Sequence, residues 1–216
     1  NYNMKVIDFS QTNSILNQYI SEIRNVEVQN DRLRFRRNIE RIGEIMAYEI
    51  SKDFTYSKKG IQSPLGIAPM NTPDDSVVIS TILRAGLPYH QGFLSYLDNA
   101  ENAFVSAYRK YKDRLNFDIH IEYIASPRLT DKTLIITDPM LATGGSAVEA
   151  VNFIKQHGGK NIKFLCIIAA PEGVKRLQEA HPDIQIYVGH LDRELNEAAY
   201  ICPGLGDAGD RIFGTK

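Results

Sequence analysis

A carboxylate and a glycine-rich turn lie close together in the middle of the chain. Apolar residues 134–137 predict a buried strand, and apolar positions at helical spacing after residue 146 predict a helix. The strand is followed by Asp138, Pro139, Met140, Leu141, Ala142, Thr143, Gly144, Gly145 and Ser146. Backbone N–H groups at such a helix start bind phosphate, and a carboxylate just upstream can accept hydrogen bonds from sugar hydroxyls. The spacing therefore suits a phosphorylated sugar.

Other nucleotide-binding and nucleophilic motifs do not match this sequence. The turn lacks the G-x-x-x-x-G-K-[ST] spacing of the nucleotide P-loop, and it lacks the three-glycine dinucleotide fingerprint. No Ser/His/Asp or Cys/His arrangement for covalent catalysis is evident. Without further motifs, residues 138–146 are equally well interpreted as an ordinary strand-to-helix turn with a helix cap.

The composition is that of a globular protein. The 216 residues are 43% hydrophobic with a net charge of −1, which favours one domain with a sizeable core and does not favour nucleic-acid binding. No apolar run reaches membrane-spanning length, so no membrane partner is expected. The two cysteines, Cys166 and Cys202, have no metal-ligand spacing and are interpreted as buried thiols in a reducing, cytoplasmic setting.

The elements that must position the turn alternate between strand and helix. Apolar periodicity predicts helices over 15–23, 35–50, 92–97, 146–157 and 171–180, and strands over 77–82, 103–108, 133–137, 162–169 and 184–188. Residues 57–75 carry Gly, Pro, Ser and Asn and predict a loop. Alternation from Phe117 to Tyr123 predicts one limb of a protruding hairpin. This order favours an α/β fold with a mostly parallel, twisted sheet flanked by helices.

Three polar side chains follow predicted strands. Arg84, Arg109 and Asp138 each come just after an apolar run. Ligands of open parallel sheets bind outside the carboxyl ends of the strands, so these residues are expected at one edge of the sheet.

Several motifs together make the sequence similar to a known family. Residues 138–146 resemble the phosphoribosyl-diphosphate signature of type I phosphoribosyltransferases, in the form found in the uracil branch. Residues 82–87, 169–173 and 200–216 resemble the same branch. The family signature usually has two adjacent acids, whereas this chain has Pro139 in the second place. The resemblance implies a C-terminal base-binding hood at about 190–216 and a hairpin arm at about 109–128 within a single domain, 1–216.

The resemblance implies transfer of a phosphoribosyl group from phosphoribosyl diphosphate (PRPP) to uracil, giving UMP and diphosphate in pyrimidine salvage. Residues 138–146 would hold the sugar phosphate, with Asp138 on the ribose hydroxyls and glycines 144 and 145 permitting close approach. Arg84 and Arg109 would bind diphosphate. Mg²⁺ would accompany the diphosphate, with Asp207 as a nearby carboxylate. Arg84, Asp138 and Asp207 are thus the expected catalytic residues.

The uracil site is expected in the C-terminal run. By resemblance, Ile201, Gly206, Asp207 and Ala208 form a slot that is lined by backbone groups. Such a slot can satisfy both carbonyl oxygens and both N–H groups of uracil, and cytosine would place an amino group against its donors.

The resemblance also bears on assembly and regulation. Hairpin arms of this kind commonly pack across a dimer, so a homodimer or a dimer of dimers is expected. Residues 110–117 depart from the acidic, proline-containing stretch of the usual bacterial arm, which weakens the expectation of a nucleotide activator such as GTP.

Two other functions are compatible with the fold. The first is a relative that uses a purine or orotate, which the Gly206–Ala208 segment opposes. The second is an RNA-binding regulator of pyrimidine operons. Pro139 and the net charge of −1 oppose that alternative, because the RNA face of a regulator should be basic.

Overall fold

The fold is built around one large sheet. The computed structural model describes residues 6–114 and 116–214, except for the side chains of Arg109, Tyr123 and Ile124. Strands of the sheet follow the order β1-β10-β9-β7-β4-β5-β6, with β8 beside β9. Their bounds are β1 (Val6–Asp8), β4 (Val77–Leu83), β5 (Glu101–Tyr111), β6 (Phe117–Ala125), β7 (Thr133–Thr137), β8 (Met140–Leu141), β9 (Asn161–Ala169) and β10 (Gln185–Leu191). All pairs are parallel except β5–β6, which confirms the predicted sheet.

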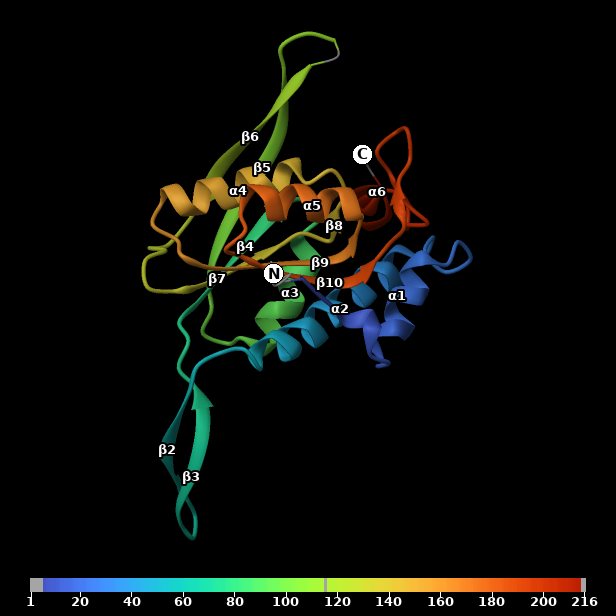
Figure 1. The fold of residues 1–216 in the computed structure, drawn as a ribbon. Helices are drawn as coiled ribbons and strands as arrows, with labels where there is room; N and C mark the ends of the chain where they lie inside the picture. Colours follow the sequence, from blue (N-terminus) through green and yellow to red (C-terminus); the bar gives the residue numbers. More distant parts are fainter. Residues whose placement is uncertain (1–5, 115, 215–216) are drawn as a thin grey trace.

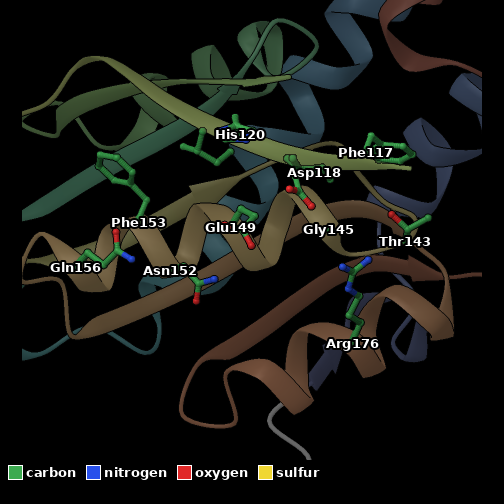
Figure 2. Close-up of a pocket in the computed structure, with 12 residues that line it drawn as sticks. Phe117, Asp118, His120, Thr143, Gly145, Glu149, Asn152, Phe153, Gln156 and Arg176 are labelled. Atoms are coloured by element: carbon green, nitrogen blue, oxygen red, sulfur yellow. The ribbon is translucent and has the colours of Figure 1, made fainter. Parts of the chain in front are cut away.

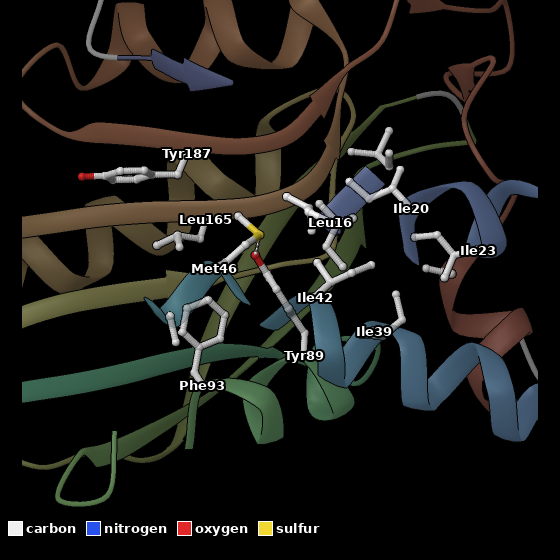
Figure 3. Close-up of a cluster of buried hydrophobic side chains, with 14 of the residues drawn as sticks. Leu16, Ile20, Ile23, Ile39, Ile42, Met46, Tyr89, Phe93, Leu165 and Tyr187 are labelled. Carbon is white, nitrogen blue, oxygen red and sulfur yellow. Dashed lines mark hydrogen bonds between the residues drawn. The ribbon is translucent and has the colours of Figure 1, made fainter. Parts of the chain in front are cut away.

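Helices cover both faces of the sheet (Figure 1). One face carries α1 (Leu16–Arg24), α2 (Arg32–Ser51) and α3 (Leu87–Tyr96), and the other carries α4 (Gly145–Gln156) and α5 (Pro171–Ala180). Successive strand residues face opposite sides, so Ile135 packs in the first layer and Ile136 in the second. Figure 3 shows the first layer, where the Tyr89 hydroxyl donates to the Met46 sulfur over 3.0 Å.

The long helices match the predictions because their signals are local. Buried residues of α2 recur at the predicted helical positions, and the Asp31 side chain caps the helix by accepting from the N–H of Arg34 at 3.1 Å. α5 starts at Pro171 as expected, and β7 has the predicted bounds. α3 starts at Leu87, five residues before the prediction, with a proline in its first turn.

The prediction of a loop at 57–75 is wrong. This segment contains an antiparallel hairpin of β2 (Tyr56–Ser63) and β3 (Gly66–Pro73), which projects from the body (Figure 1). Nearly all of its residues are exposed on both faces. A strand without a buried face has no reason to alternate apolar and polar residues, so period-two analysis cannot detect it.

The predicted hairpin arm is present and projects beyond the opposite end of the sheet (Figure 1). Pairing of β5 with β4 ends at Leu83–Ser106, and from there β5 continues to Tyr111 paired with β6 alone. Arg109 therefore lies within a strand, opposite Ile119, and does not follow a strand end as predicted.

The C-terminal residues form a small irregular layer beside α1 and α2. It contains the antiparallel pair β11 (Glu194–Leu195) and β12 (Ile201–Cys202) and the short helix α6 (Ala208–Phe213). Figure 1 shows this segment in red next to the blue N-terminal helices. A 3-10 turn at Phe9–Gln11 follows β1. Among the described residues, no helix combines the length and apolarity needed to cross a membrane.

Candidate active site

A cavity of about 400 Å³ lies at the carboxyl edge of the sheet. It opens where β7 ends and α4 begins, and the C-terminal layer closes its other side. The wall is formed by Asp138, residues 140–147, residues 198–200 and Asp207. The cavity therefore joins two segments that are more than fifty positions apart in the sequence.

The turn before α4 forms a cradle of backbone groups. Gly144 is the N-cap of α4 and has a φ of +87°, a conformation that favours glycine. Within the described chain, no side chain caps this helix, so the N–H groups of its first turn face the cavity side without an intrahelical partner. Such a helix start attracts an anion through these N–H groups and through the helix dipole.

The start of α5 supports the cradle from behind. A Cβ on Gly173 would lie 2.4 Å from the Ala142 carbonyl oxygen, and a Cβ on Gly144 would lie 2.9 Å from the Gly173 carbonyl oxygen. The N–H of Ala170 donates to the Leu141 carbonyl at 2.9 Å. These contacts give residues 169–173 a role in fixing the cradle.

Gly145 lines the cavity and also packs against the arm. A Cβ at this position would lie 2.6 Å from Cδ1 of Ile119 on the arm. The sequence interpretation attributed this glycine to close phosphate approach, whereas its Cβ direction points to β6. Pro139 lies outside the cavity wall: it is buried, and its carbonyl accepts from the N–H groups of Ile167 and Ile168 at 2.9 and 3.1 Å.

Asp138 is a half-buried carboxyl group at the end of β7. Its Oδ1 accepts from the N–H of Met140 at 3.4 Å, and its own N–H donates to the Leu165 carbonyl at 3.1 Å. No cationic side chain pairs with it within residues 6–114 and 116–214. Burial raises the pKa of Asp138 to about 7, and the Met140 N–H opposes that shift.

The two predicted diphosphate-binding arginines lie outside this cavity wall. Arg84 follows β4 after a cis Leu83–Arg84 peptide bond and is exposed, with its guanidinium carbon 5.5 Å from the centre of the Phe213 ring in α6. Arg109 lies on the arm, and its side chain is outside the described part of the chain.

The predicted uracil-binding residues lie together in the C-terminal layer. Asp207 lines the cavity and also caps α6, accepting from the N–H of Asp210 at 2.9 Å. Ile201 and Ala208 are buried, and Gly206 has a φ of +89°. Asp207 is therefore the residue of this set that reaches the cavity wall.

The turn at residues 198–200 is a part of the wall that was not predicted from the sequence. Asn196 Oδ1 accepts from the N–H groups of Ala198 and Tyr200 at 2.9 and 3.0 Å, and Ala199 has a φ of +63°. Asparagine favours turns because its side chain accepts from the backbone N–H two residues further on, so Asn196 could have indicated this turn.

A second cavity of about 640 Å³ lies between the arm and α4 (Figure 2). Thr143 and Gly145 line both cavities, so the cradle is the partition between them. Arg176 of α5, which the sequence analysis did not single out, points toward Gly145 in Figure 2. Its Nη1 lies 3.4 Å from the position of a Cβ on Gly145.

The carboxylates of the first cavity suit a metal ion that binds together with a phosphate-containing substrate. Asp138 and Asp207 are the carboxylates of its wall. Groups of three or more metal-ligating side chains do not occur among the described residues. Mg²⁺ is typically bound by one or two carboxylates together with phosphate oxygens and water, and these two side chains fit that pattern.

The parallel sheet, the cradle and the closing C-terminal layer define a phosphoribosyltransferase of type I. A hypoxanthine phosphoribosyltransferase structure from Staphylococcus aureus shares this fold with a TM-score of 0.52 at 14% identity, covering 74% of this chain and 76% of that chain. The family model for uracil phosphoribosyltransferase matches residues 10–215, and the chain belongs to that family.

Two relatives are similar over nearly their whole length. A uracil phosphoribosyltransferase of Porphyromonas gingivalis is 56% identical over 215 residues, which are 99% of this chain and 100% of that protein. The structure of the AQ2163 protein from Aquifex aeolicus has a TM-score of 0.87 at 32% identity and covers 98% of this chain and 99% of that chain.

Proposed function

We propose that this protein transfers the phosphoribosyl group of PRPP to uracil, forming UMP and releasing diphosphate. The observation that carries the proposal is the single cavity that joins the backbone cradle at Gly144 to Asp207 of the C-terminal layer. A phosphate at one end and a base at the other are the two parts of a nucleotide that must meet at the anomeric carbon.

The cradle is assigned to the 5′-phosphate. The first-turn N–H groups of α4 would donate to phosphate oxygens, and the hydroxyl groups of Thr143 and Ser146 add donors on the same wall. Asp138 follows the end of β7 and lines the same cavity as the cradle. A ribose attached to the bound phosphate would lie beside it. Its carboxylate is assigned to the ribose hydroxyls.

The reaction needs alignment and charge stabilisation more than a nucleophile on the protein. The bond to diphosphate breaks as positive charge develops on the ribose and negative charge on the leaving group. An ionised Asp138 beside the ribose stabilises the developing positive charge. We assign Arg84 and Arg109 to the diphosphate, which requires the Arg84 guanidinium to leave its position near Phe213 when substrate binds.

Mg²⁺ is assigned to the diphosphate of PRPP, where it neutralises phosphate charge. Asp207 and Asp138 are the carboxylates that would reach it. Asp207 keeps a free oxygen for this role while its Oδ1 caps α6.

Uracil is assigned to the segment formed by Ile201, Gly206, Asp207 and Ala208. The positive φ of Gly206 turns the backbone there, so that peptide N–H and C=O groups rather than side chains would face the base. Backbone donors and acceptors match the two carbonyls and the N3–H of uracil. N1, which loses its proton and bonds to the anomeric carbon, is then directed toward the ribose. Cytosine would leave a donor facing a donor, which opposes its binding.

The arm is assigned to assembly of a homodimer or a dimer of dimers. Tyr108, Tyr111 and Phe117 are 42%, 60% and 41% exposed on it, and burial of such aromatic side chains against a second copy would be favourable. Sedimentation of the purified protein tests this assignment, and a monomer at micromolar concentration contradicts it.

The test of the proposed function is an assay of diphosphate release with a panel of bases. The purified protein is given PRPP, Mg²⁺ and one base at a time: uracil, cytosine, orotate, adenine, guanine or hypoxanthine. We expect release with uracil alone, dependence on Mg²⁺, and UMP as the second product. Repetition with GTP is expected to leave the rate unchanged. Turnover of a purine or of orotate in preference to uracil contradicts the proposal.

A further inference from the structure

Two buried polar side chains hold the backbone of two consecutive residues, Gly204 and Leu205, in the C-terminal layer. The N–H of Gly204 donates to Oδ2 of Asp192 at 2.8 Å, and the carbonyl of Leu205 accepts from Nε2 of Gln29 at 3.1 Å. Neither Asp192 nor Gln29 lines the cavity, and Gln29 comes from the N-terminal part of the chain. Figure 1 shows these two parts of the chain, in red and blue, lying against each other.

Asp192 is itself anchored by two other side chains. Its side chain is 0% exposed and lies at the end of β10. The Arg24 guanidinium of α1 contacts both carboxylate oxygens, with Nη1 to Oδ2 at 3.3 Å and a closer Nη2–Oδ1 contact, and His190 Nδ1 lies 2.8 Å from Oδ1. A buried carboxylate that is paired in this way stays fixed, because any movement leaves a charge without its partner.

Gln29 is anchored in the same manner. It is 4% exposed and lies between α1 and α2. Its Nε2 donates both to Leu205 and to the Ile23 carbonyl, the second at 2.9 Å. The side-chain amide therefore uses its two N–H groups to join the last turn of α1 to the C-terminal layer.

The turn at Gly204 connects the anchored residues to the proposed uracil site. Gly204 has a φ of +58°, and a Cβ there would lie 2.0 Å from the Ile201 carbonyl oxygen, so the chain is tightly folded back on Ile201. The anchored peptide groups at 204 and 205 come directly before Gly206, Asp207 and Ala208. The direction of the backbone groups in that segment therefore depends on where residues 204 and 205 are held.

We propose that Gln29 and Asp192 are positioning residues that set uracil affinity and selectivity by fixing the backbone of residues 204–208. This inference rests on the proposed function, because it takes that segment as the base site. Peptide groups are the same in every residue, so amino-acid substitutions cannot change the groups that contact the base in such a slot. The side chains that orient those peptide groups then determine its geometry.

The main test replaces Gln29 with methionine, which has a similar length and no N–H donor. We expect the KM for uracil to rise about 10-fold, because a buried carbonyl loses its hydrogen bond and the slot loses its fixed orientation. The KM for PRPP should change less, by about 2- to 3-fold, since the cradle lies on α4 and only the assigned Asp207 contact with Mg²⁺ belongs to this segment. The rate with cytosine relative to uracil should rise.

A matched control is a buried amide on the same helical layer. Asn38 of α2 is 1% exposed, and its hydrogen bonds go to Glu22 and Arg41 instead of residues 201–208. Asn38→Leu should lower thermal stability to a similar degree without changing the KM for uracil. This comparison separates loss of positioning from general loss of folded protein.

A second variant tests Asp192 independently. Asp192→Asn keeps the size of the side chain and removes the charge that pairs with Arg24. We expect a selective rise in the KM for uracil of about 10-fold or more. If this variant does not fold, Arg24→Lys, which keeps the charge but loses the two-point contact, is expected to show a smaller rise in the same direction.

The outcomes distinguish this inference from the proposed function. If the unmodified protein does not use uracil, the proposed function fails. If it uses uracil, and the Gln29 variant and the Asp192 or Arg24 variant leave the KM for uracil unchanged, as expected for Asn38→Leu, or change both KM values equally, the positioning role is wrong.

Discussion

The two ends of the cavity are built in different ways. The phosphate end is one continuous strand-turn-helix unit in which Gly144 starts α4, and the backbone itself supplies the binding groups. The base end is an irregular layer in which α6, with six residues, is the longest element. Side chains from outside this layer, Asp192 and Gln29, hold it in place.

This difference indicates how each end responds to change. A rigid cradle on a helix start should tolerate few substitutions within the turn. Outside the turn it should depend only on residues that pack directly against it, such as Gly173. A layer held by distant polar contacts should respond to substitutions that never touch the ligand. Substitutions at the two ends can test that contrast.

The largest effect is expected at Asp138, which belongs to the rigid end. Asp138→Asn removes the negative charge beside the ribose while keeping the shape of the side chain. We expect kcat to fall by about 10²–10³, the typical loss when one charge-stabilising group is removed. Steady-state kinetics with saturating PRPP measures this change.

A control for Asp138 is an exposed carboxylate that is remote from the cavity. Asp183 pairs with Lys155 on the surface, so Asp183→Asn should leave kcat unchanged. Near-normal activity of the Asp138 variant removes this residue from the active site.

The next effect is expected at Gly144. Gly144→Ala places a Cβ 2.9 Å from the Gly173 carbonyl oxygen at a φ of +87°, so the cradle must shift. We expect the KM for PRPP to rise about 10-fold or more, because phosphate binding depends on the directions of the backbone N–H groups. Calorimetric titration with PRPP measures the same loss as a binding constant.

The other end of the same helix supplies a matched variant. Gly158 follows α4 with a φ of +89°, and its Cβ would lie 3.2 Å from Oγ1 of Thr130. Gly158→Ala should lower stability by about 1 kcal/mol, as expected for a residue with a side chain in this conformation. PRPP binding should not change. Equal losses of affinity in both variants would show that backbone strain, and not the cradle, controls PRPP binding.

The same contrast explains which parts of the molecule could be predicted from sequence. The phosphate end could be predicted because β7, the turn and α4 are adjacent in the chain, and their periodicity and glycines are local signals. The base end was found by its resemblance to a family, and its support was missed. Nothing near Gln29 or Asp192 indicates a contact with residues 204 and 205, because such contacts form only in the complete fold.

Two further errors have similar physical causes. The β2–β3 hairpin was taken for a loop because it buries neither face. Arg109 was placed at a strand end because the apolar pattern stops at Tyr108, whereas hydrogen bonds to β6 extend β5 to Tyr111. In both segments, backbone pairing rather than burial determines the structure.

The activity should depend on pH through Asp138 at the phosphate end. Because burial raises the pKa of Asp138 to about 7, the free protein carries a protonated Asp138 below that pH. We expect kcat/KM for PRPP to fall about 10-fold per pH unit below about pH 6.5, and this dependence should be absent in Asp138→Asn. A pH profile with constant ionic strength measures the effect. An unchanged profile in the variant indicates that another group is responsible.

The raised pKa of Asp138 has a consequence for stability as well. The folded state holds this proton up to about pH 7, whereas the unfolded chain releases it near its ordinary pKa, so folding stability decreases as pH rises between these values. Asp138→Asn should therefore stabilise the free protein by about 2 kcal/mol at pH 8.5, or roughly 4–8 °C in Tm, and much less near pH 5. Thermal unfolding at the two pH values checks the sign. A destabilised variant at the higher pH contradicts the argument.

The smallest effect is expected at Glu172, which holds the base end through a hydrogen bond on the protein surface. The N–H of Leu195 donates to Oε2 of Glu172 at 3.0 Å, which ties β11 to the first turn of α5. Both groups contact solvent, so Glu172→Ala should raise the KM for uracil only about 2- to 3-fold. Lys175→Ala, on the exposed side of the same helix, serves as the control. If Glu172→Ala raised this KM as much as Gln29→Met, burial of the anchor would not matter, and the base end would depend on the number of its contacts alone.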